Sequence, residues 1–537
     1  MVISKRTLLS LFFFLFSGRL LGQESRYMVF FKDKNGTPYS VAQPLQFLSQ
    51  KSVNRRTKQG LTILPQDLPV NPGYVAEVKA TGAKMKYATK WFNGILMEAT
   101  TDQKDLVKAL PNVFSIEYVA PGKTGTGGRV RSPAKSAIAL TESSTKNQYT
   151  ITGLDAMRID GLTGANITIA VFDSGFPAVN SNLAFNHLIQ DGRILDAYNF
   201  SYGNTNVFIG DDHGARVLSV MAANLPSDFT GGVVDASYLL YSTEFDATEF
   251  RVEEYNWAFA AERADSAGAD IISSSLGYNT FDDITMDYTI GDLDGETTVI
   301  SKAAMFASER GMVVVSAAGN LGNDSSWGLV AAPADVKNVI AVGSIDAQYN
   351  RSPSSSLGPT ADNRVKPDAM AMGTSVAHVA PGGAISYGSG TSFSCPLITS
   401  LVAGVWQQWP DLKAIDMVNL IRQAGSKFFH PDNAFGYGVP TYQAIKHIMD
   451  YESQHVGITL YPVPIIKHLS IEANPADGSR VSVVIQNSMG QVWHNVSYEL
   501  SWGSIPFTMD LEELPSGVYW VSITKLNERK IFRVIKK

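Results

Sequence analysis

The chain has 537 residues, of which 45% are hydrophobic and 18% are charged, which is typical of a folded protein and excludes a largely disordered one. This length exceeds one compact core, so two to four domains are expected. The formal net charge is −6 and no long basic run occurs, which argues against a nucleic-acid partner.

The first 22 residues have the pattern of an export signal. Lys5 and Arg6 precede an apolar stretch at 8–16 that is too short to span a bilayer, and small residues follow up to Gly22. This pattern predicts a signal peptide over 1–22. The protein is therefore expected to be secreted, extracellular or attached to the cell surface, reaching these places through the periplasm.

Residues 27–120 are predicted to form a small α+β domain. Strand-like and helix-like segments alternate here, and an alternation of this size suits a ferredoxin-like fold. The expected strands cover 27–31, 94–100 and 113–119, and the expected helices cover 43–57, 74–80 and 102–110.

Residues 121–146 are interpreted as a linker. Their first part is rich in Gly, Ser, Lys and Arg and has no apolar periodicity. Such a composition indicates an exposed and cleavable segment. Because it follows a predicted export signal and a small domain, it is a candidate maturation region.

Residues 147–452 are predicted to form a large α/β domain. Its apolar runs are continuous rather than alternating, as in strands that are buried on both faces of a parallel sheet. Helical stretches lie between them, so the fold class is α/β with a doubly wound, mostly parallel sheet. The expected strands cover 167–173, 269–277, 311–320 and 338–344, and the expected helices cover 213–223, 250–267 and 298–310.

Residues 456–537 change character. Stretches such as 480–487 and 517–524 alternate apolar and polar residues and are separated by turn residues. This pattern predicts a small all-β sandwich.

Four polar residues stand at expected element ends in the large domain. Asp173 and Asn320 end expected buried strands, and each could be an ordinary turn residue. His213 opens a helix, where a capping or surface histidine is common. Ser392 also opens a helix, and its hydroxyl alone suggests an N-cap.

Together the four residues predict nucleophilic catalysis. A serine nucleophile needs a base, and the base needs a carboxylate that fixes its tautomer. Asp173, His213 and Ser392 supply these groups. The side-chain amide of Asn320 and the backbone N–H of Ser392 are candidate donors to the oxyanion.

The segments around these residues resemble those of the subtilisin-like serine proteases. They read VFDSG at Asp173, DDHGARVLSVMAA at His213, VSAAGN up to Asn320 and GTSFSCP at Ser392, and they occur in order. The resemblance implies a subtilisin-like α/β fold. It also implies a secreted serine endopeptidase that cleaves protein or peptide substrates through an acyl-enzyme.

The resemblance extends to substrate binding. It implies that two segments with small, uncharged residues wall the side-chain pocket, so apolar or neutral side chains are expected at the cleaved position. These residues are Ser275, Leu276, Gly277, Ala317, Ala318 and Gly319.

The flanking domains gain a role from the same resemblance. Residues 27–120 resemble a propeptide that assists folding and inhibits the enzyme. Within 456–537, the pieces YPVP at 461–464, LPSGVYWVSIT at 514–524 and KIFRVIKK at the basic end resemble the sorting domain of the Bacteroidetes type IX secretion system. This resemblance implies a secretion machinery as partner, although Val463 stands where that family usually has Asn. A β-sandwich with another binding role stays open here.

No cofactor is expected to be required. The acidic stretch at 291–295 lacks the full ligand set of a known calcium loop, so a polar turn is favoured while calcium stays open. No zinc site is expected, because the required His and Cys spacing is missing. The single cysteine, Cys395, is expected to be buried.

Two other classes of function fit the sequence less well. A binding protein on a degenerate protease scaffold would usually lack a triad residue, and this chain has all three candidates. A lipase or esterase would need G-x-S-x-G followed by Asp and His, and this order is not found.

Overall fold

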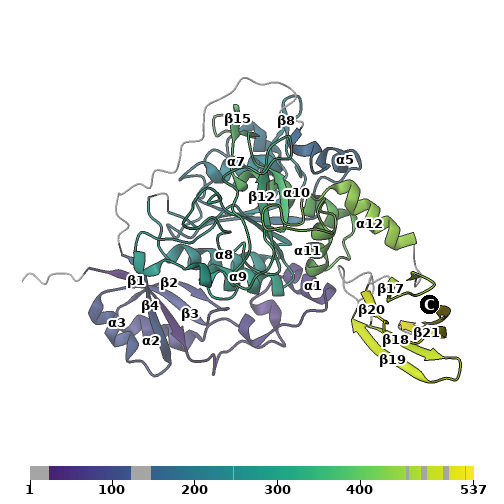
Figure 1. Ribbon diagram of the computed structural model, residues 1–537. Coiled ribbons are helices and arrows are strands. Elements are labelled where there is room, and N and C mark those ends of the chain that lie inside the picture. Colours follow the sequence, from purple (N-terminus) through teal and green to yellow (C-terminus); the bar gives the residue numbers. More distant parts are fainter. Residues whose placement is uncertain are drawn as a thin grey trace, which may run out of the picture.

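The computed structural model describes residues 23–122, 147–245, 247–454, 459–472, 480–499, 507–525 and 528–537 (Figure 1). The signal peptide predicted over 1–22 lies outside the described residues. So does the predicted linker, except for its first two residues, Pro121 and Gly122.

The N-terminal domain, residues 23–122, has the predicted ferredoxin-like fold. Its four strands form an antiparallel sheet in the order β2-β3-β1-β4. The sequence did not indicate β2, because its lysines are partly exposed and alternate with only partly buried residues. The elements are β1 (Ser25–Phe31), α1 (Gln50–Lys58), α2 (Pro72–Ala80), β2 (Lys84–Thr89), β3 (Gly94–Ala99), α3 (Thr101–Lys108) and β4 (Val113–Pro121).

The central domain, residues 147–454, is built on a seven-stranded sheet in which every described pair is parallel. The strand order is β13-β12-β11-β10-β5-β9-β6. The predicted doubly wound sheet is confirmed. The strands are β5 (Thr168–Asp173), β6 (Ile194–Asn199), β9 (Ser237–Ser242), β10 (Ile271–Ser274), β11 (Val313–Ala317), β12 (Val339–Ile345) and β13 (Ala369–Met372).

Helices cover both faces of this sheet, which explains why its strands are apolar throughout. Along β5, Ile169 and Val171 join the core beneath α7 and α10, whereas Ala170 and Phe172 join the core beneath α8 and α9. The helices are α5 (Leu154–Ile159), α6 (Asn186–Gln190), α7 (His213–Ala222), α8 (Val252–Ala267), α9 (Val299–Glu309), α10 (Thr391–Gln408), α11 (Ala414–Gln423) and α12 (Tyr442–Gln454).

Short elements complete the first two domains. Two small antiparallel ribbons pair β7 (Asn224–Leu225) with β8 (Phe229–Thr230) and β14 (Val376–Val379) with β15 (Ile385–Gly388). Single 3₁₀ turns occur at Pro44–Gln46, Pro65–Asp67, Leu183–Phe185, Ile284–Met286 and Ile290–Asp292.

The C-terminal strands form two antiparallel sheets, in the orders β16-β17-β20 and β19-β18-β21-β22. Residues from both sheets, such as Leu469 and Val483, share one buried apolar cluster. The predicted all-β sandwich is confirmed. The strands are β16 (Thr459–Tyr461), β17 (His468–Glu472), β18 (Arg480–Asn487), β19 (Val492–Glu499), β20 (Phe507–Asp510), β21 (Gly517–Lys525) and β22 (Glu528–Lys536).

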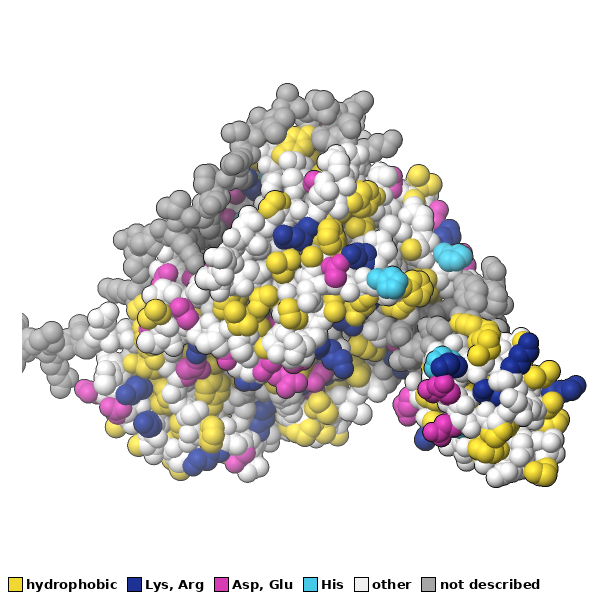
Figure 2. Space-filling view, in the orientation of Figure 1, with side chains coloured by type: hydrophobic (Ala, Val, Ile, Leu, Met, Phe, Trp, Pro, Cys, Tyr) yellow, Lys and Arg dark blue, Asp and Glu magenta, His cyan; other side chains and the backbone are white. Residues whose placement is uncertain are grey.

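Figure 2 shows hydrophobic, basic and acidic side chains interspersed over one face of the molecule. Among the helices of the described residues, none is both long and apolar enough to cross a membrane.

Candidate active site

Asp173 ends β5 at the carboxyl edge of the central sheet, where ligands of open α/β sheets gather. Its side chain is fully buried, and one carboxylate oxygen accepts the backbone N–H of Ser174 at 2.8 Å. Gly214 lets α7 approach closely, because a Cβ there would stand 2.9 Å from the Cβ of Asp173.

His213 is the first residue of α7, as predicted, and faces this carboxylate. Its Nδ1 lies 2.9 and 3.0 Å from the two carboxylate oxygens of Asp173. A carboxylate can only accept, so this contact places a proton on Nδ1 and leaves the lone pair on Nε2. The His213 side chain keeps 24% of its surface exposed, so the ring borders both the protein interior and solvent.

Ser392 lies at the start of α10 but is not its N-cap. The cap position belongs to Gly390, which provides no side-chain cap, and Ser392 is the second residue of the helix. The expectation that the Ser392 hydroxyl caps the helix is therefore wrong, because the helix begins before Ser392 rather than after it. The backbone N–H of Ser392 still belongs to the first turn, which has no intrahelical acceptors.

Pro396 explains a further feature of the motif GTSFSCP. A proline has no N–H, so it cannot donate to the carbonyl oxygen four residues earlier, which belongs to Ser392. The hydroxyl of Ser275 donates to that oxygen instead, at 2.9 Å. The nucleophile candidate is thereby tied to the segment that follows β10.

The amide of Asn320 is oriented by Thr391. The backbone N–H and the hydroxyl of Thr391 donate to Asn320 Oδ1, at 2.9 and 3.2 Å. Because Oδ1 accepts both groups of Thr391, the Nδ2 donor of the same amide points away from Thr391.

Gly390 lies beside both Ser392 and Asn320. A Cβ on this glycine would stand 3.2 Å from Ser392 Oγ and 3.4 Å from the amide nitrogen of Asn320. The ring of Phe393 also packs edge-on against His213, with 6.1 Å between ring centroids. The structure thus brings Asp173, His213, Asn320 and Ser392 to one place.

The six candidate substrate-binding residues lie at the carboxyl ends of two neighbouring parallel strands: Ala317 is the last residue of β11, and the other five directly follow β10 or β11. Cβ atoms added at Gly277 and Gly319 would stand 2.9 and 3.4 Å from the Cβ of Ala331, so both segments meet over that residue. Leu276, Ala317 and Ala318 are buried, whereas Gly277 is exposed.

Sequence reasoning missed three residues of this region. Thr391 lies within the quoted motif, so its position was visible although its role was not. His378 gave no sequence signal, yet it is fully buried and stacks on Phe393 with 5.1 Å between ring centroids. Burial lowers the pKa of His378 to about 4. Gly390 is the first residue of the motif GTSFSCP, but the motif alone did not indicate that it lies beside Asn320.

Cys395 is buried, as predicted, and burial raises the pKa of its thiol to about 11. In the acidic stretch at 291–295, Asp294 accepts the backbone N–H groups of Glu296 and Thr297 at 2.8 and 2.7 Å. Within the described ranges, no group of three or more His, Cys, Asp or Glu residues could hold a metal ion.

Three segments match known family models. Residues 26–134 match the "Peptidase S8 propeptide domain, Bacteroidota", residues 164–438 match the "Subtilase family", and residues 459–537 match the "Secretion system C-terminal sorting domain". The resemblances of both flanking domains are thereby confirmed.

Known proteases are similar to about half of the chain or more. Subtilisin from Bacillus pumilus is 30% identical over 48% of this chain and 82% of its own length. Subtilisin DY from Bacillus licheniformis is 27% identical over 53% of this chain and 91% of its own length. MycP1 from Mycobacterium smegmatis, whose crystal structure is solved, is 23% identical in sequence to this chain. The match covers 61% of this chain and 92% of the MycP1 chain, with a TM-score of 0.46.

The Subtilase match spans over half of the chain and includes all four candidate residues, Asp173, His213, Asn320 and Ser392. The matched residues contain the doubly wound parallel sheet that the sequence predicted. The chain therefore belongs to the subtilase family of serine endopeptidases.

Proposed function

We propose that Ser392 is the nucleophile of this endopeptidase, with His213 as its base and Asp173 as the group that orients the base. The observation that carries the proposal is the contact of His213 Nδ1 with both carboxylate oxygens of Asp173, at 2.9 and 3.0 Å. This contact leaves Nε2 as the proton acceptor, which is the tautomer that the reaction needs.

In the proposed reaction, Ser392 Oγ attacks the carbonyl carbon of the scissile peptide bond while His213 Nε2 takes the hydroxyl proton. The protonated ring then gives that proton to the leaving amine, and an acyl-enzyme remains on Ser392. Water, deprotonated by His213, attacks the ester and releases the second product. Asp173 stays ionised and stabilises the charged ring.

The tetrahedral intermediate carries a negative oxygen, for which two donors are proposed. One is Asn320 Nδ2, whose direction follows from the two bonds that Thr391 donates to Oδ1. The other is the backbone N–H of Ser392 in the first turn of α10, where the helix dipole also favours negative charge.

The specificity pocket is proposed to lie between residues 275–277 and 317–319, which carry no charged side chain. Neutral or apolar side chains would enter such a pocket without leaving a charge buried and unpaired. The N-terminal domain is proposed to inhibit the enzyme before maturation. The C-terminal sorting domain supports export, and the final location is proposed to be extracellular or on the cell surface.

The test uses the purified protein and its Ser392→Ala variant. Both are incubated with a fluorophosphonate probe, and casein cleavage is followed in parallel. Labelling and cleavage in the wild type, both absent in the variant, are expected. Absence of labelling in wild-type protein from which residues 23–122 have been removed would contradict the proposal and favour a binding protein on a protease scaffold.

A further inference from the structure

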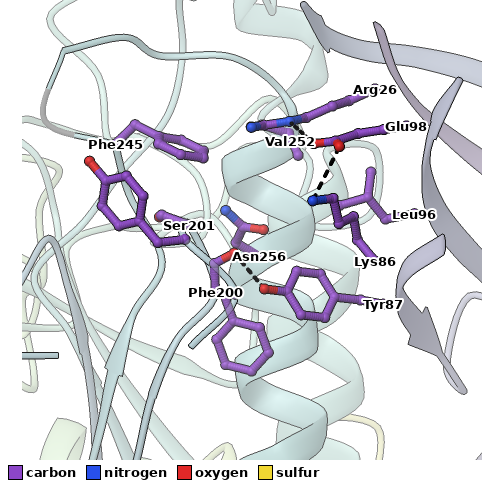
Figure 3. A pocket seen from close by; sticks show the side chains of 12 residues that line it. Arg26, Lys86, Tyr87, Leu96, Glu98, Phe200, Ser201, Phe245, Val252 and Asn256 are labelled. Carbon is purple, nitrogen blue, oxygen red and sulfur yellow. Dashed lines mark hydrogen bonds and ion pairs between the residues drawn. The ribbon is translucent and has the colours of Figure 1, made fainter. Parts of the chain in front are cut away.

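A pocket of about 200 Å³ lies where the N-terminal sheet faces the central domain (Figure 3). No residue that lines it takes part in the proposed reaction or in the proposed specificity pocket. Its N-terminal wall includes Arg26, Lys86 and Glu98, and its central-domain wall includes Ser201, Phe245 and Asn256.

This pocket reaches the edge of the sheet that carries the candidate active site. The backbone N–H of Thr243, which follows β9, donates to the carbonyl oxygen of Asp173 at 3.0 Å. Asn256 Nδ2 donates to the carbonyl oxygen of Thr243, also at 3.0 Å. These bonds fix the start of the segment 243–245 beside Asp173, and the segment ends at Phe245 in the wall of the pocket. Phe245 is therefore two residues from a direct contact with the candidate active site.

Phe245 and the proposed specificity pocket lie on opposite sides of Asp173 along this edge. The strands are ordered β11-β10-β5-β9, and Asp173 ends β5. The proposed specificity pocket lies at the ends of β10 and β11, whereas Phe245 follows β9. Ligands of open α/β sheets bind along this edge, beyond the carboxyl ends of the strands. An extended peptide that crosses the edge therefore brings different residues to the two pockets.

A cation of the N-terminal domain lies against the ring of Phe245. The guanidinium carbon of Arg26 is 4.9 Å from the centre of this ring, which is within the range of a cation–π interaction. Figure 3 shows Arg26 extending from the N-terminal sheet toward Phe245, with Glu98 beside it at 3.4 Å. Tyr202 packs edge-on against Phe245, with 5.8 Å between ring centroids. Arg26 therefore shows which kind of side chain this aromatic wall accepts.

The central-domain side of the pocket suits a cation. Two buried acidic residues adjoin Phe245, because Glu244 precedes it in the chain and Glu253 Oε2 accepts its backbone N–H at 3.4 Å. Of the described central-domain residues that line the pocket, none is basic. Both cations of the pocket, Arg26 and Lys86, come from the N-terminal domain. Without that domain, the aromatic wall has acidic residues behind it and no basic residue in front of it.

We propose that, in the enzyme without its N-terminal domain, this pocket binds a basic side chain of the substrate and that Phe245 selects it. Arg is favoured over Lys, because a planar guanidinium group stacks on an aromatic ring. The strand order places this basic residue some positions away from the residue that enters the proposed specificity pocket. The inference rests on the proposed function, since it assumes that substrates lie along the edge at Asp173, so binding and cleavage are measured separately.

Binding is measured on the Ser392→Ala protein. The whole chain is expressed, so that the N-terminal domain is present during folding, and residues 23–122 are then digested away with an added protease that is afterwards inhibited. Mass spectrometry confirms that these residues are gone. Arg is moved through each position of a fluorescently labelled, otherwise neutral peptide, and each dissociation constant is compared with that of the matching citrulline peptide. Citrulline has nearly the shape of Arg but no charge.

At one position, the Arg peptide is expected to bind about 3- to 30-fold more tightly than the citrulline peptide. A ratio below about twofold at every position would overturn the proposal. Wild-type protein treated in the same way should show a similar ratio of kcat/KM for the two peptides. Binding with the expected ratio but no cleavage would contradict only the catalytic assignment. Cleavage without any such ratio would contradict only the binding site.

Two substitutions of Phe245 test whether its ring selects the cation. Phe245→Leu keeps an apolar side chain but removes the ring, so the ratio between Arg and citrulline peptides is expected to fall to about one. Phe245→Trp is the matched variant, which keeps an aromatic face and should keep or raise the ratio. If Phe245→Leu weakens binding of both peptides alike and leaves the ratio unchanged, Phe245 only supports the structure, and its selective role is wrong.

Discussion

Both carboxylate oxygens of Asp173 face Nδ1 of His213, at 2.9 and 3.0 Å, with the carboxylate fully buried and the ring partly exposed. Asp173→Asn would place an amide here and favour the opposite tautomer of the ring. We expect kcat to fall about 10⁴-fold, the size known for this change in a serine protease triad. Steady-state hydrolysis of a chromogenic peptide measures it. A fall below tenfold would mean that Asp173 does not set the tautomer.

Asn320→Ala removes one proposed oxyanion donor. We expect kcat to fall about 10²–10³-fold with little change in KM, which is the size known for loss of this kind of donor in a subtilisin. The expected split between kcat and KM arises because the donor acts mainly on the transition state. A change confined to KM would assign Asn320 to substrate binding instead.

Thr391 is expected to act through Asn320. Thr391→Val removes the hydroxyl that donates to Asn320 Oδ1 but keeps the backbone donor. One lost hydrogen bond is worth about 1 kcal/mol, so a fall in kcat of about fivefold is expected. Thr391→Ser is the matched control, because it keeps the hydroxyl and should keep the rate. In an Asn320→Ala background the Thr391→Val effect should disappear.

Gly390→Ala tests the convergence of groups at the start of α10. The φ angle of Gly390 is 143°, and a Cβ would stand 3.2 Å from Ser392 Oγ. The added methyl group would push against the hydroxyl of the proposed nucleophile and strain the backbone, so activity is expected to fall at least about tenfold, the equivalent of 1.4 kcal/mol. Circular dichroism should show an unchanged fold. Full activity in this variant would mean that the region adjusts freely.

His378 should make the protein sensitive to acid. Its ordinary pKa of 6.5 is lowered by burial to about 4, so the unfolded chain binds a proton at a higher pH than the folded one. The contribution of the neutral His378 ring to the free energy of unfolding is fully present above pH 6.5 and is lost as the pH falls toward 4. Linkage gives a loss of about 2 kcal/mol between pH 7.5 and pH 5.

Urea unfolding of Ser392→Ala protein, with and without His378→Gln, measures this effect and avoids self-digestion. The difference in the free energy of unfolding between the two proteins should be about 2 kcal/mol smaller at pH 5 than at pH 7.5. The charged groups nearest to the ring, Arg216, Asp212 and His213, are the same in both proteins and cancel in the comparison. A difference that is independent of pH would contradict the shifted pKa.

Substrate preference gives the last prediction. Because the segments 275–277 and 317–319 carry no charged side chain, cleavage of a peptide library is expected mainly after apolar or neutral residues. Mass spectrometry of the products identifies the cleaved bonds. Cleavage mainly after Arg or Lys would show that an acidic group elsewhere in the chain reaches the pocket.

The sequence predicted those parts of the fold that depend on local pattern. The strands β5, β10, β11 and β12 read as continuous apolar runs because helices cover both faces of the sheet. Asp173 is the last residue of β5, and Asn320 lies shortly after the end of β11. The edge strand β2 escaped prediction, because half-exposed lysines hide its alternation.

Contacts between residues that are far apart along the chain could not be predicted from the sequence. The cap of α10 was misplaced by two residues, since Ser392 looks like a cap and only the backbone of Gly390 shows otherwise. His378 and Arg55, which is buried in an ion pair with Asp265, gave no signal, because burial of a histidine or an arginine depends on which other part of the chain covers it. Arg55 and Asp265 are 210 residues apart.

The hydrogen bond from Ser275 to the carbonyl oxygen of Ser392 joins residues that are 117 positions apart, and Pro396 cannot donate to that oxygen. The position of the proposed nucleophile therefore depends on a long-range contact as well as on its own helix. A chain still being threaded through an export channel, with α10 not yet docked beside β10, would have a serine but no active centre. The proposed activity thereby requires completion of the fold.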